Sequence, residues 1–125
     1  MNTPAHLKYT KSDEWFDPTT GKAGLTDFAQ GQLSDIVFVE ILVAAGDTVE
    51  VGTAIASVES VKAAAEIYSP VAGQVVAINA DLSSASETLN SDPFGAGWMI
   101  QVTGADGSGL MDAPTYEADC AGRAH

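Results

Sequence analysis

The stretch VESVKAAAEIYSP, Val58 to Pro70, decides the fold because it places a turn between two runs of strand-forming residues. The run TAIASV leads into it and AAAEIY follows, so the residues ESVK between them favour the tip of a hairpin. Between Lys22 and Arg123 the chain has fourteen carboxylates and a single cation, Lys62, at this tip. A mixed, solubilising surface does not account for so isolated a lysine, which indicates a more particular role.

Further short strands are indicated on both sides of this hairpin. The run IVFVEILV, residues 36–43, is rich in β-branched residues, TVEVG at 48–52 alternates strictly, and QVVAIN at 74–79 follows the turn SPVAG. Four or more strands in about forty residues, each bounded by Gly, Pro, Asp or Asn, predict a mainly β fold of the sandwich or barrel kind.

A weak internal repeat flanks the lysine. VAAGDTVEVG, Val43 to Gly52, and SPVAGQVVAI, Ser69 to Ile78, both place a glycine turn before an alternating strand. Approximate two-fold symmetry, with Lys62 at a tip between the two copies, would explain this repeat. The alternative is coincidence in a β-rich composition.

The segments outside this centre predict smaller elements in a single domain, residues 1–125, whose core hairpin region spans about 36–79. Thr26 is a candidate helix N-cap, and Pro114 lies near the start of a C-terminal helix. The predicted elements are strands at Leu7–Thr10 and around Trp15, a turn at Asp17–Gly21, a helix within Leu25–Asp35, one helical turn after Asn79, a strand at 98–102 and a helix from Asp112 to about Cys120.

Composition limits the partners and the compartment. A net charge of −12 disfavours nucleic acid and anionic membrane surfaces and favours protein partners with basic docking faces, although acidity that only maintains solubility is the alternative. The single cysteine, Cys120, cannot form an intrachain disulfide and suits a reducing compartment. MNTPAHLKYT has no signal-peptide pattern, and no run is apolar enough to cross a membrane, so we expect a soluble protein that is not exported.

The chemistry of an exposed lysine favours modification over catalysis. A lysine amine in water is almost wholly protonated at neutral pH, and a hairpin tip offers no dry pocket to change this. We therefore expect a partner enzyme to modify Lys62, and we predict no catalytic residue. His6 and His125 lie in terminal segments without a nearby cysteine or paired histidine, so no metal site is expected, and Cys120 is interpreted as a packed or half-exposed thiol.

The string VESVKA resembles the lipoylation site of the glycine cleavage system H proteins. ESVKA differs from the MKM usual in biotin carriers and from the DKA usual in lipoyl domains of 2-oxoacid dehydrogenases. The resemblance covers about Leu7 to Tyr116, and the matching segments, in the family's order, are LKYTKSDEW, GLTDFAQGQLSDIVFVE, SPVAGQVVAIN and LNSDPFGAGWMI.

This resemblance implies a hybrid barrel-sandwich of the lipoyl/biotinyl-carrier type with quasi-two-fold symmetry and short flanking helices. It implies lipoate bound covalently as N6-lipoyllysine at Lys62, on a carrier and not an enzyme. The arm would take an aminomethyl group from the PLP-dependent glycine decarboxylase (P protein) to the tetrahydrofolate-dependent aminomethyltransferase (T protein), and then its dithiol to dihydrolipoyl dehydrogenase (L protein). Lipoate-attaching enzymes are further partners, and a bacterial, cytoplasmic monomer is expected.

The resemblance also assigns roles to individual residues. Glu14 matches an acidic residue near the cleft that holds the arm, which the flanking segments would form; the alternative is a solvated acid on an edge strand. Glu59 and Val61 would be recognised by the attaching enzyme, or would only shape the turn.

Three positions depart from the family's pattern. Asp13 replaces a usual histidine and could alter contacts to the cargo, and Ser34 replaces a usual glycine and would strain a helix end. A proline usual near Val43 or Ala44 is missing.

Three other functions remain open from the sequence. The chain could be an H-like carrier that relays octanoyl or lipoyl groups to other proteins, since Lys62 serves either role. It could be an enzyme that uses Glu14 and Asp13 as paired carboxylates, or an unmodified interaction module.

Overall fold

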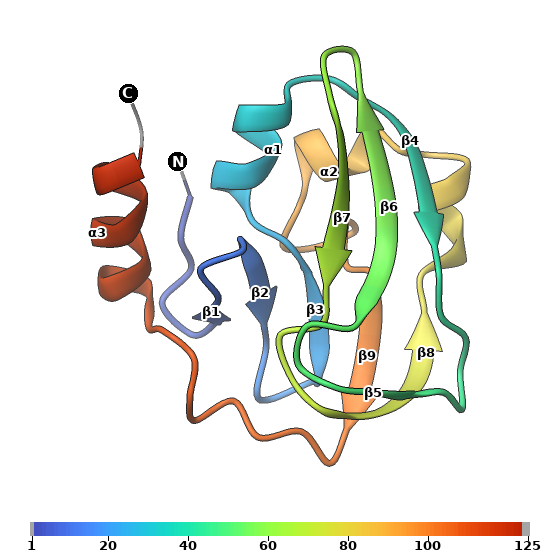
Figure 1. Ribbon diagram of the computed structural model, residues 1–125, viewed down its shortest axis with the longest axis vertical. Helices are drawn as coiled ribbons and strands as arrows, with labels where there is room; N and C mark the ends of the chain where they lie inside the picture. The colour runs from blue at the N-terminus through green and yellow to red at the C-terminus, as the bar shows by residue number, and fades with distance from the viewer. Residues whose placement is uncertain (1, 124–125) are drawn as a thin grey trace.

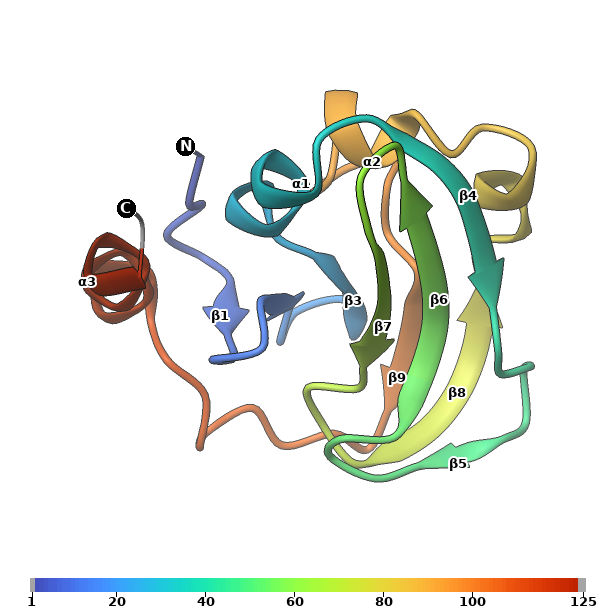
Figure 2. The same ribbon diagram turned by 45° about the horizontal axis from the view of Figure 1, so that its top comes forward.

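Two antiparallel sheets face each other in the computed structural model, which describes residues 2–123 (Figures 1 and 2). The larger sheet has the strand order β1-β2-β3-β9-β8-β5, and the smaller sheet has the order β4-β6-β7. The strands are β1 (Lys8–Tyr9), β2 (Glu14–Phe16), β3 (Lys22–Leu25), β4 (Ile36–Ile41), β5 (Thr48–Val49), β6 (Ala54–Ser60), β7 (Ala64–Tyr68), β8 (Gly73–Ile78) and β9 (Ile100–Thr103). The helices are α1 (Asp27–Leu33), the short 3-10 helix η1 (Ala80–Ser83), α2 (Thr88–Ser91) and α3 (Ala113–Arg123).

The main core lies between the two sheets. Val58 of β6 and Ile67 of β7 point inward from the smaller sheet, and Val75 of β8 and Ile100 of β9 meet them from the larger one, all of them almost inaccessible to solvent. In the regular parts of the strands alternate side chains face this core, and register shifts in the β4–β6, β6–β7 and β8–β9 pairs interrupt the alternation. The predicted hybrid barrel-sandwich with short flanking helices is confirmed.

The two copies of the internal repeat come together in the larger sheet. β5 lies in the first copy and β8 in the second, and they pair antiparallel with Thr48 opposite Gln74 and Val49 opposite Gly73. The two pairing segments lie at similar distances along the chain on either side of Lys62.

The structure differs from the sequence prediction mainly at β3, which was not predicted. Its residues KAGL have little intrinsic preference for a strand, but β3 joins β2 to β9 and so connects the N-terminal strands to the core. Gly24 lies opposite Trp15 across the β2–β3 pair, where the missing side chain leaves room for the indole ring. Tertiary packing therefore creates this strand.

The predicted strand at 36–43 also differs, because β4 ends at Ile41. An irregularity in its register between Ile36 and Phe38 turns Val37 and Phe38 toward solvent.

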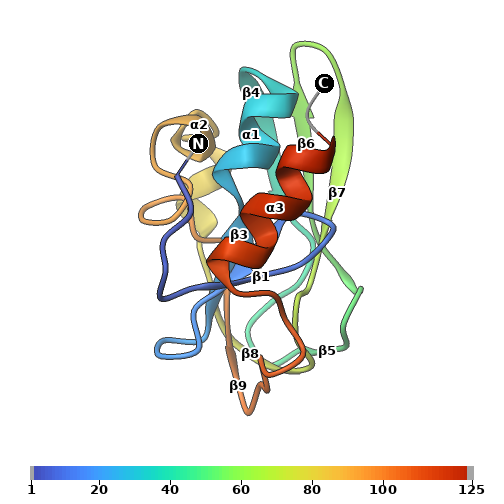
Figure 3. The same ribbon diagram turned by 90° about the vertical axis from the view of Figure 1, so that its left-hand side faces the viewer.

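A second cluster attaches α3 to the N-terminal strands (Figure 3). The rings of Tyr9 and Tyr116 stack with their centroids 4.7 Å apart, and Trp15 is buried in the same cluster. Cys120 is buried there as a free thiol, so of the two expected alternatives it is packed and not half-exposed. No helix within the described part of the chain is long and apolar enough to cross a membrane.

Candidate functional site

Lys62 is exposed at the tip of the β6–β7 hairpin, which reaches the upper end of the molecule beside α1 in Figure 1. The hydroxyl of Ser60 shapes this tip, because its Oγ accepts hydrogen bonds from the backbone N–H groups of Lys62 (3.2 Å) and Ala63 (3.0 Å). Glu59 and Val61 on either side of Ser60 are exposed, as recognition by an enzyme requires. The turn presents the lysine amine without disturbing the core.

The backbone ties this tip to the C-terminal end of α1. The N–H of Val61 donates to the carbonyl oxygen of Asp35 at 3.1 Å, and Asp35 follows α1 by two residues. This bond connects the backbone next to Lys62 with the end of the helix that lines the nearer side of β7.

Two cavities follow β7 from the region of the tip, and we call them together the β7 groove. The nearer cavity is about 180 Å³ and lies between β7, α1 and the turn before β2; the farther cavity is about 350 Å³. Ser12 lines both. The nearer cavity is lined by Ser12, Asp13, Leu25, Ala29, Gln32, Leu33, Ala65, Glu66 and Ile67, and the farther by Thr10, Ser12, Glu14, Val51, Gly52, Tyr68 and Ser69.

Apolar surface predominates in both cavities, and each also contains charged and polar groups. Leu25, Ala29, Leu33 and Ile67 line the nearer cavity together with Asp13 and Glu66, and the farther cavity holds the Glu14 carboxylate with the Thr10 and Ser12 hydroxyls at one side. At about 3.3 Å per residue, the farther cavity at Tyr68 lies roughly 20 Å along the strand direction from Lys62. The geometry suits a long, flexible and largely apolar attachment along β7, with Glu14 available to a polar group at its end.

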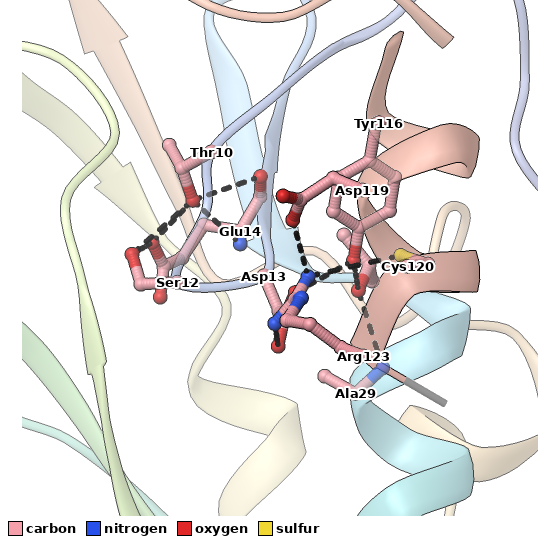
Figure 4. A network of polar contacts seen from close by, with 10 residues as sticks. Thr10, Ser12, Asp13, Glu14, Ala29, Tyr116, Asp119, Cys120 and Arg123 are labelled. Carbon is pink, nitrogen blue, oxygen red and sulfur yellow. Dashed lines mark hydrogen bonds and ion pairs between the residues drawn. The ribbon is translucent and has the colours of Figure 1, made fainter. Parts of the chain in front are cut away.

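Glu14 of β2, drawn in Figure 4, is the charged group of the farther cavity. Only 1% of its surface is exposed. Its Oε1 accepts hydrogen bonds from Thr10 Oγ1 (2.8 Å) and Ser12 Oγ (2.6 Å), and its Oε2 accepts a longer one from the Tyr68 N–H (3.4 Å). Burial raises the pKa of the Glu14 carboxyl, the hydrogen bonds oppose this rise, and the nearby Asp13 charge adds to it. The alternative of a solvated edge acid is wrong.

The carboxylate of Asp13 is directed to other partners. Arg123 binds it through two nitrogens, Nη2 to Oδ1 at 2.7 Å and Nη1 to Oδ2 at 3.2 Å, and the Tyr116 hydroxyl donates to Oδ1 at 2.9 Å. Figure 4 shows Asp13 with these partners and Glu14 with Thr10 and Ser12. The two neighbouring carboxylates thus make different hydrogen bonds, which does not favour an enzyme that uses them as a pair.

The other two departures have visible local consequences. Ser34 caps α1 with φ of 67°, so a non-glycine residue does occupy a strained helix end, as predicted. The N–H of Ala44 donates to Asp47 Oδ2 at 2.9 Å, a bond that proline at this position could not make.

The structure describes one of the two histidines considered as metal ligands. His6 is exposed, and His125 lies outside the described residues. Among residues 2–123 no group of three or more His, Cys, Asp or Glu side chains is arranged to hold a metal ion.

Sequence reasoning found Lys62 and Glu14 but missed the rest of the groove. Thr10, Ser12 and Tyr68 are common surface residues, and no motif marks them before the strands are folded together. Thr10, Ser12 and Glu14 come together through the turn between β1 and β2, whose Asp13 has a left-handed φ, and no strand alternation in TKSDE marks them.

The fold and an exposed lysine at a hairpin tip define a carrier domain of the lipoyl/biotinyl class. A family model described as glycine cleavage H-protein matches residues 7–121. The chain belongs to this family, which serves as the lipoyl-carrying component of the glycine cleavage system.

Individual relatives agree with this assignment. The chain is 47% identical to a glycine cleavage system H protein of Nitratidesulfovibrio vulgaris (strain DP4), with 100% of both chains covered. It is 49% identical to the one from Idiomarina loihiensis, covering 94% of this chain and 95% of that one. The crystal structure of a glycine cleavage system H protein from Mycobacterium marinum superposes with a TM-score of 0.81 at 32% identity, covering 92% and 96% of the two chains.

Proposed function

We propose that this chain bears lipoate as an amide on Lys62 and carries an aminomethyl group between the enzymes of glycine cleavage. It would receive the group at the PLP-dependent glycine decarboxylase and deliver it to the tetrahydrofolate-dependent aminomethyltransferase, before dihydrolipoyl dehydrogenase reoxidises the arm. The observation that carries the proposal is the arrangement of an exposed Lys62 beside a groove that contains the buried Glu14.

The residues of the groove fit a lipoyl arm. The apolar side chains of the nearer cavity suit a hydrocarbon chain, and they would exclude water from it. When bound, lipoate supplies a dithiolane whose sulfur accepts the aminomethyl group. Glu14 Oε2 has only the long bond from Tyr68, so it can accept a further hydrogen bond from a cationic amine in the cavity.

The chain itself would do no chemistry and would act as a monomeric carrier in the bacterial cytoplasm. A tether raises the effective concentration of the cargo at each docked active site. Lipoate-attaching enzymes would recognise the tip through the exposed Glu59 and Val61. Relay of octanoyl or lipoyl groups to other proteins remains the second candidate role, because it uses the same exposed lysine.

Intact-mass measurement of the chain from cells supplied with lipoate tests attachment. We expect a lipoyl increment on the natural chain and on Lys11→Arg, a matched change at another exposed lysine. Lys62→Arg should lack the increment and keep the same circular dichroism spectrum. A natural chain without the increment, or a Lys62→Arg chain that carries it, would contradict the proposal.

A reconstituted assay separates the two carrier roles. The lipoylated chain should support decarboxylation of glycine when the decarboxylase, the aminomethyltransferase and dihydrolipoyl dehydrogenase are added. If the lipoylated chain transferred its acyl group to other apoproteins but supported no decarboxylation, the relay role would replace the shuttle.

A further inference from the structure

Side chains of α3 contact the two elements that form opposite sides of the β7 groove, the turn before β2 and the start of α1. The Tyr116 hydroxyl donates to Asp13 Oδ1 at 2.9 Å and lies 2.7 Å from Thr26 Oγ1. Arg123 adds its two bonds to the Asp13 carboxylate, and its guanidinium lies 5.1 Å from the ring centroid of Phe28 in α1. One helix therefore contacts both the turn before β2 and the beginning of α1 (Figures 3 and 4).

Asp13 belongs to the turn that forms one side of the groove. It lies between Ser12 and Glu14, its N–H donates to the Thr10 carbonyl at 3.2 Å, and its own carbonyl accepts from the Thr26 N–H at 3.0 Å. Its φ of 75° is in the left-handed region, which a non-glycine residue occupies at a cost in free energy. The surrounding contacts must maintain this conformation. Among them, the bidentate ion pair with Arg123 is charge-assisted and therefore of a stronger kind than the neutral hydrogen bonds.

Thr26 belongs to the opposite side. Its Oγ1 accepts from the Ala29 N–H at 3.2 Å and so caps α1. Leu25 and Ala29, on either side of this cap, line the nearer cavity, as does Leu33 at the other end of the helix. Neither Tyr116 nor Arg123 lines either cavity.

We propose that Arg123 and Tyr116 are positioning residues for the arm: they hold the Thr10–Asp13 turn against the N-cap of α1, and this fixes Ser12 and Glu14 at the groove. The expected effect on the cargo rests on the proposed function. The expected effect on the position of the turn concerns the unmodified chain and can be tested without lipoate. Loss of Arg123 leaves the Asp13 carboxylate with the bond from the Tyr116 hydroxyl, while the backbone bonds of Asp13 to Thr10 and Thr26 remain. The turn then gains access to other backbone conformations, and the hydroxyl and carboxylate of Ser12 and Glu14 lose their fixed distance from α1.

The forked geometry predicts a graded series of variants. Arg123→Gln removes the charge and the fork, whereas Arg123→Lys keeps the charge but cannot bind both carboxylate oxygens in a plane. Lys11→Gln is the matched control, because Lys11 is an exposed cation in the same turn and its loss changes the net charge equally. A purely electrostatic effect of net charge would therefore appear in both Gln variants.

Amide hydrogen exchange of the unmodified chain measures the structural part. In Arg123→Gln we expect the Asp13 and Thr26 amides to exchange roughly fivefold faster, the size expected for loss of a partly exposed ion pair, and in Arg123→Lys by less. The amides of Val58 and Ile67, in the β6–β7 hairpin, should be unaffected, and so should all four in Lys11→Gln. Equal exchange of the Asp13 and Thr26 amides in Arg123→Gln and Lys11→Gln would overturn the proposal.

The hydrolysis lifetime of the aminomethyl cargo measures the consequence, with Glu14→Gln as a reference variant. We expect the lifetime to be shortened severalfold in Arg123→Gln, partly restored in Arg123→Lys, and unchanged in Lys11→Gln. A shortened lifetime in Glu14→Gln with an unchanged one in Arg123→Gln would overturn the positioning role and leave the proposed groove intact. Unchanged lifetimes in both would show that the groove does not hold the cargo, and the positioning role would fall with it.

Discussion

Replacing Glu14 by glutamine separates the role of this carboxylate in holding cargo from its effect on stability. The glutamine side chain keeps an oxygen that can accept from Thr10 and Ser12, whose bonds to Oε1 are 2.8 and 2.6 Å. The group that is lost is Oε2, the oxygen with the single long bond from Tyr68. The amide nitrogen that takes its place donates hydrogen bonds and cannot accept one from an amine.

The expected loss follows from the kind of bond removed. A hydrogen bond to a charged group contributes about 1.5–3 kcal/mol, and each 1.4 kcal/mol changes an equilibrium tenfold. The fraction of time for which the aminomethyl end occupies the cavity should therefore fall roughly ten- to hundredfold relative to the undocked arm. Hydrolysis of the cargo should accelerate toward the rate of an unprotected arm.

The stability of the folded chain should also depend on the protonation of Glu14, and therefore on pH. Burial raises the pKa of Glu14 in the folded chain, so the folded state holds this proton more tightly than the unfolded chain does. The free energy of unfolding is therefore highest below the unfolded pKa and declines as pH rises through the window up to the folded pKa. The glutamine of the Glu14→Gln variant does not titrate, so the stability of this variant relative to the natural chain should increase with pH across that window.

Thermal unfolding from about pH 4 to about pH 8 measures this difference, and cargo lifetime at neutral pH measures protection. Glu87→Gln is the matched control, because Glu87 is exposed and makes no side-chain cap to α2. A Glu14→Gln chain with an unchanged lifetime would refute the cargo contact. A relative stability that does not change with pH would refute the buried, desolvated carboxylate.

Three further predictions concern the tip, the charge and the core. Ser60→Ala should slow lipoylation, measured by mass spectrometry, because it removes the hydroxyl that shapes the tip. It should lower the free energy of unfolding by less than about 1 kcal/mol, since the exposed amides of Lys62 and Ala63 can bond to water instead. Equal attachment rates would show that the tip does not need this hydroxyl. Raising the salt concentration should weaken apparent affinity for the glycine decarboxylase severalfold, as screening of the −12 charge requires, and an affinity independent of salt would limit that charge to solubility. Gly24→Ala should destabilise the chain by about 1–3 kcal/mol in thermal or urea unfolding, because the added Cβ would lie 3.0–3.1 Å from three atoms of the Trp15 ring. An unchanged stability would show that the ring can move aside.

The central hairpin could be predicted from sequence because its information is local. The strand-forming runs, the turn and the isolated Lys62 all lie within Thr53–Pro70. The structure has this hairpin, but the turn is Val61–Ala63 and not ESVK, because β6 continues through Glu59 and Ser60. The N-cap at Thr26 was predictable for the same reason, since the residue type and the helix that follows it are neighbours in sequence. Such patterns can be recognised in the sequence because the residues that interact are close along the chain.

The groove and the α3 contacts could not be predicted in the same way. Glu14 is buried because β7 brings Tyr68 to it, across a separation of 54 residues. The bonds from Arg123 to Asp13 span 110 residues and follow no spacing rule. The strand β3 depends on Trp15 packing over Gly24 and not on its own composition. Each of these features exists only when distant segments pack together.

The position of β7 at the edge of the smaller sheet has a consequence for aggregation. An uncovered edge strand offers unpaired backbone groups to any other extended chain, and proteins commonly cover such edges or place charge beside them. Here the buried carboxylate of Glu14 accepts the Tyr68 N–H, and α1 and the turn before β2 line cavities with β7 residues. We therefore expect the groups that form the groove to hinder pairing of β7 with a neighbouring molecule, and a chain with a displaced turn to self-associate through this edge as well as fail to protect its cargo.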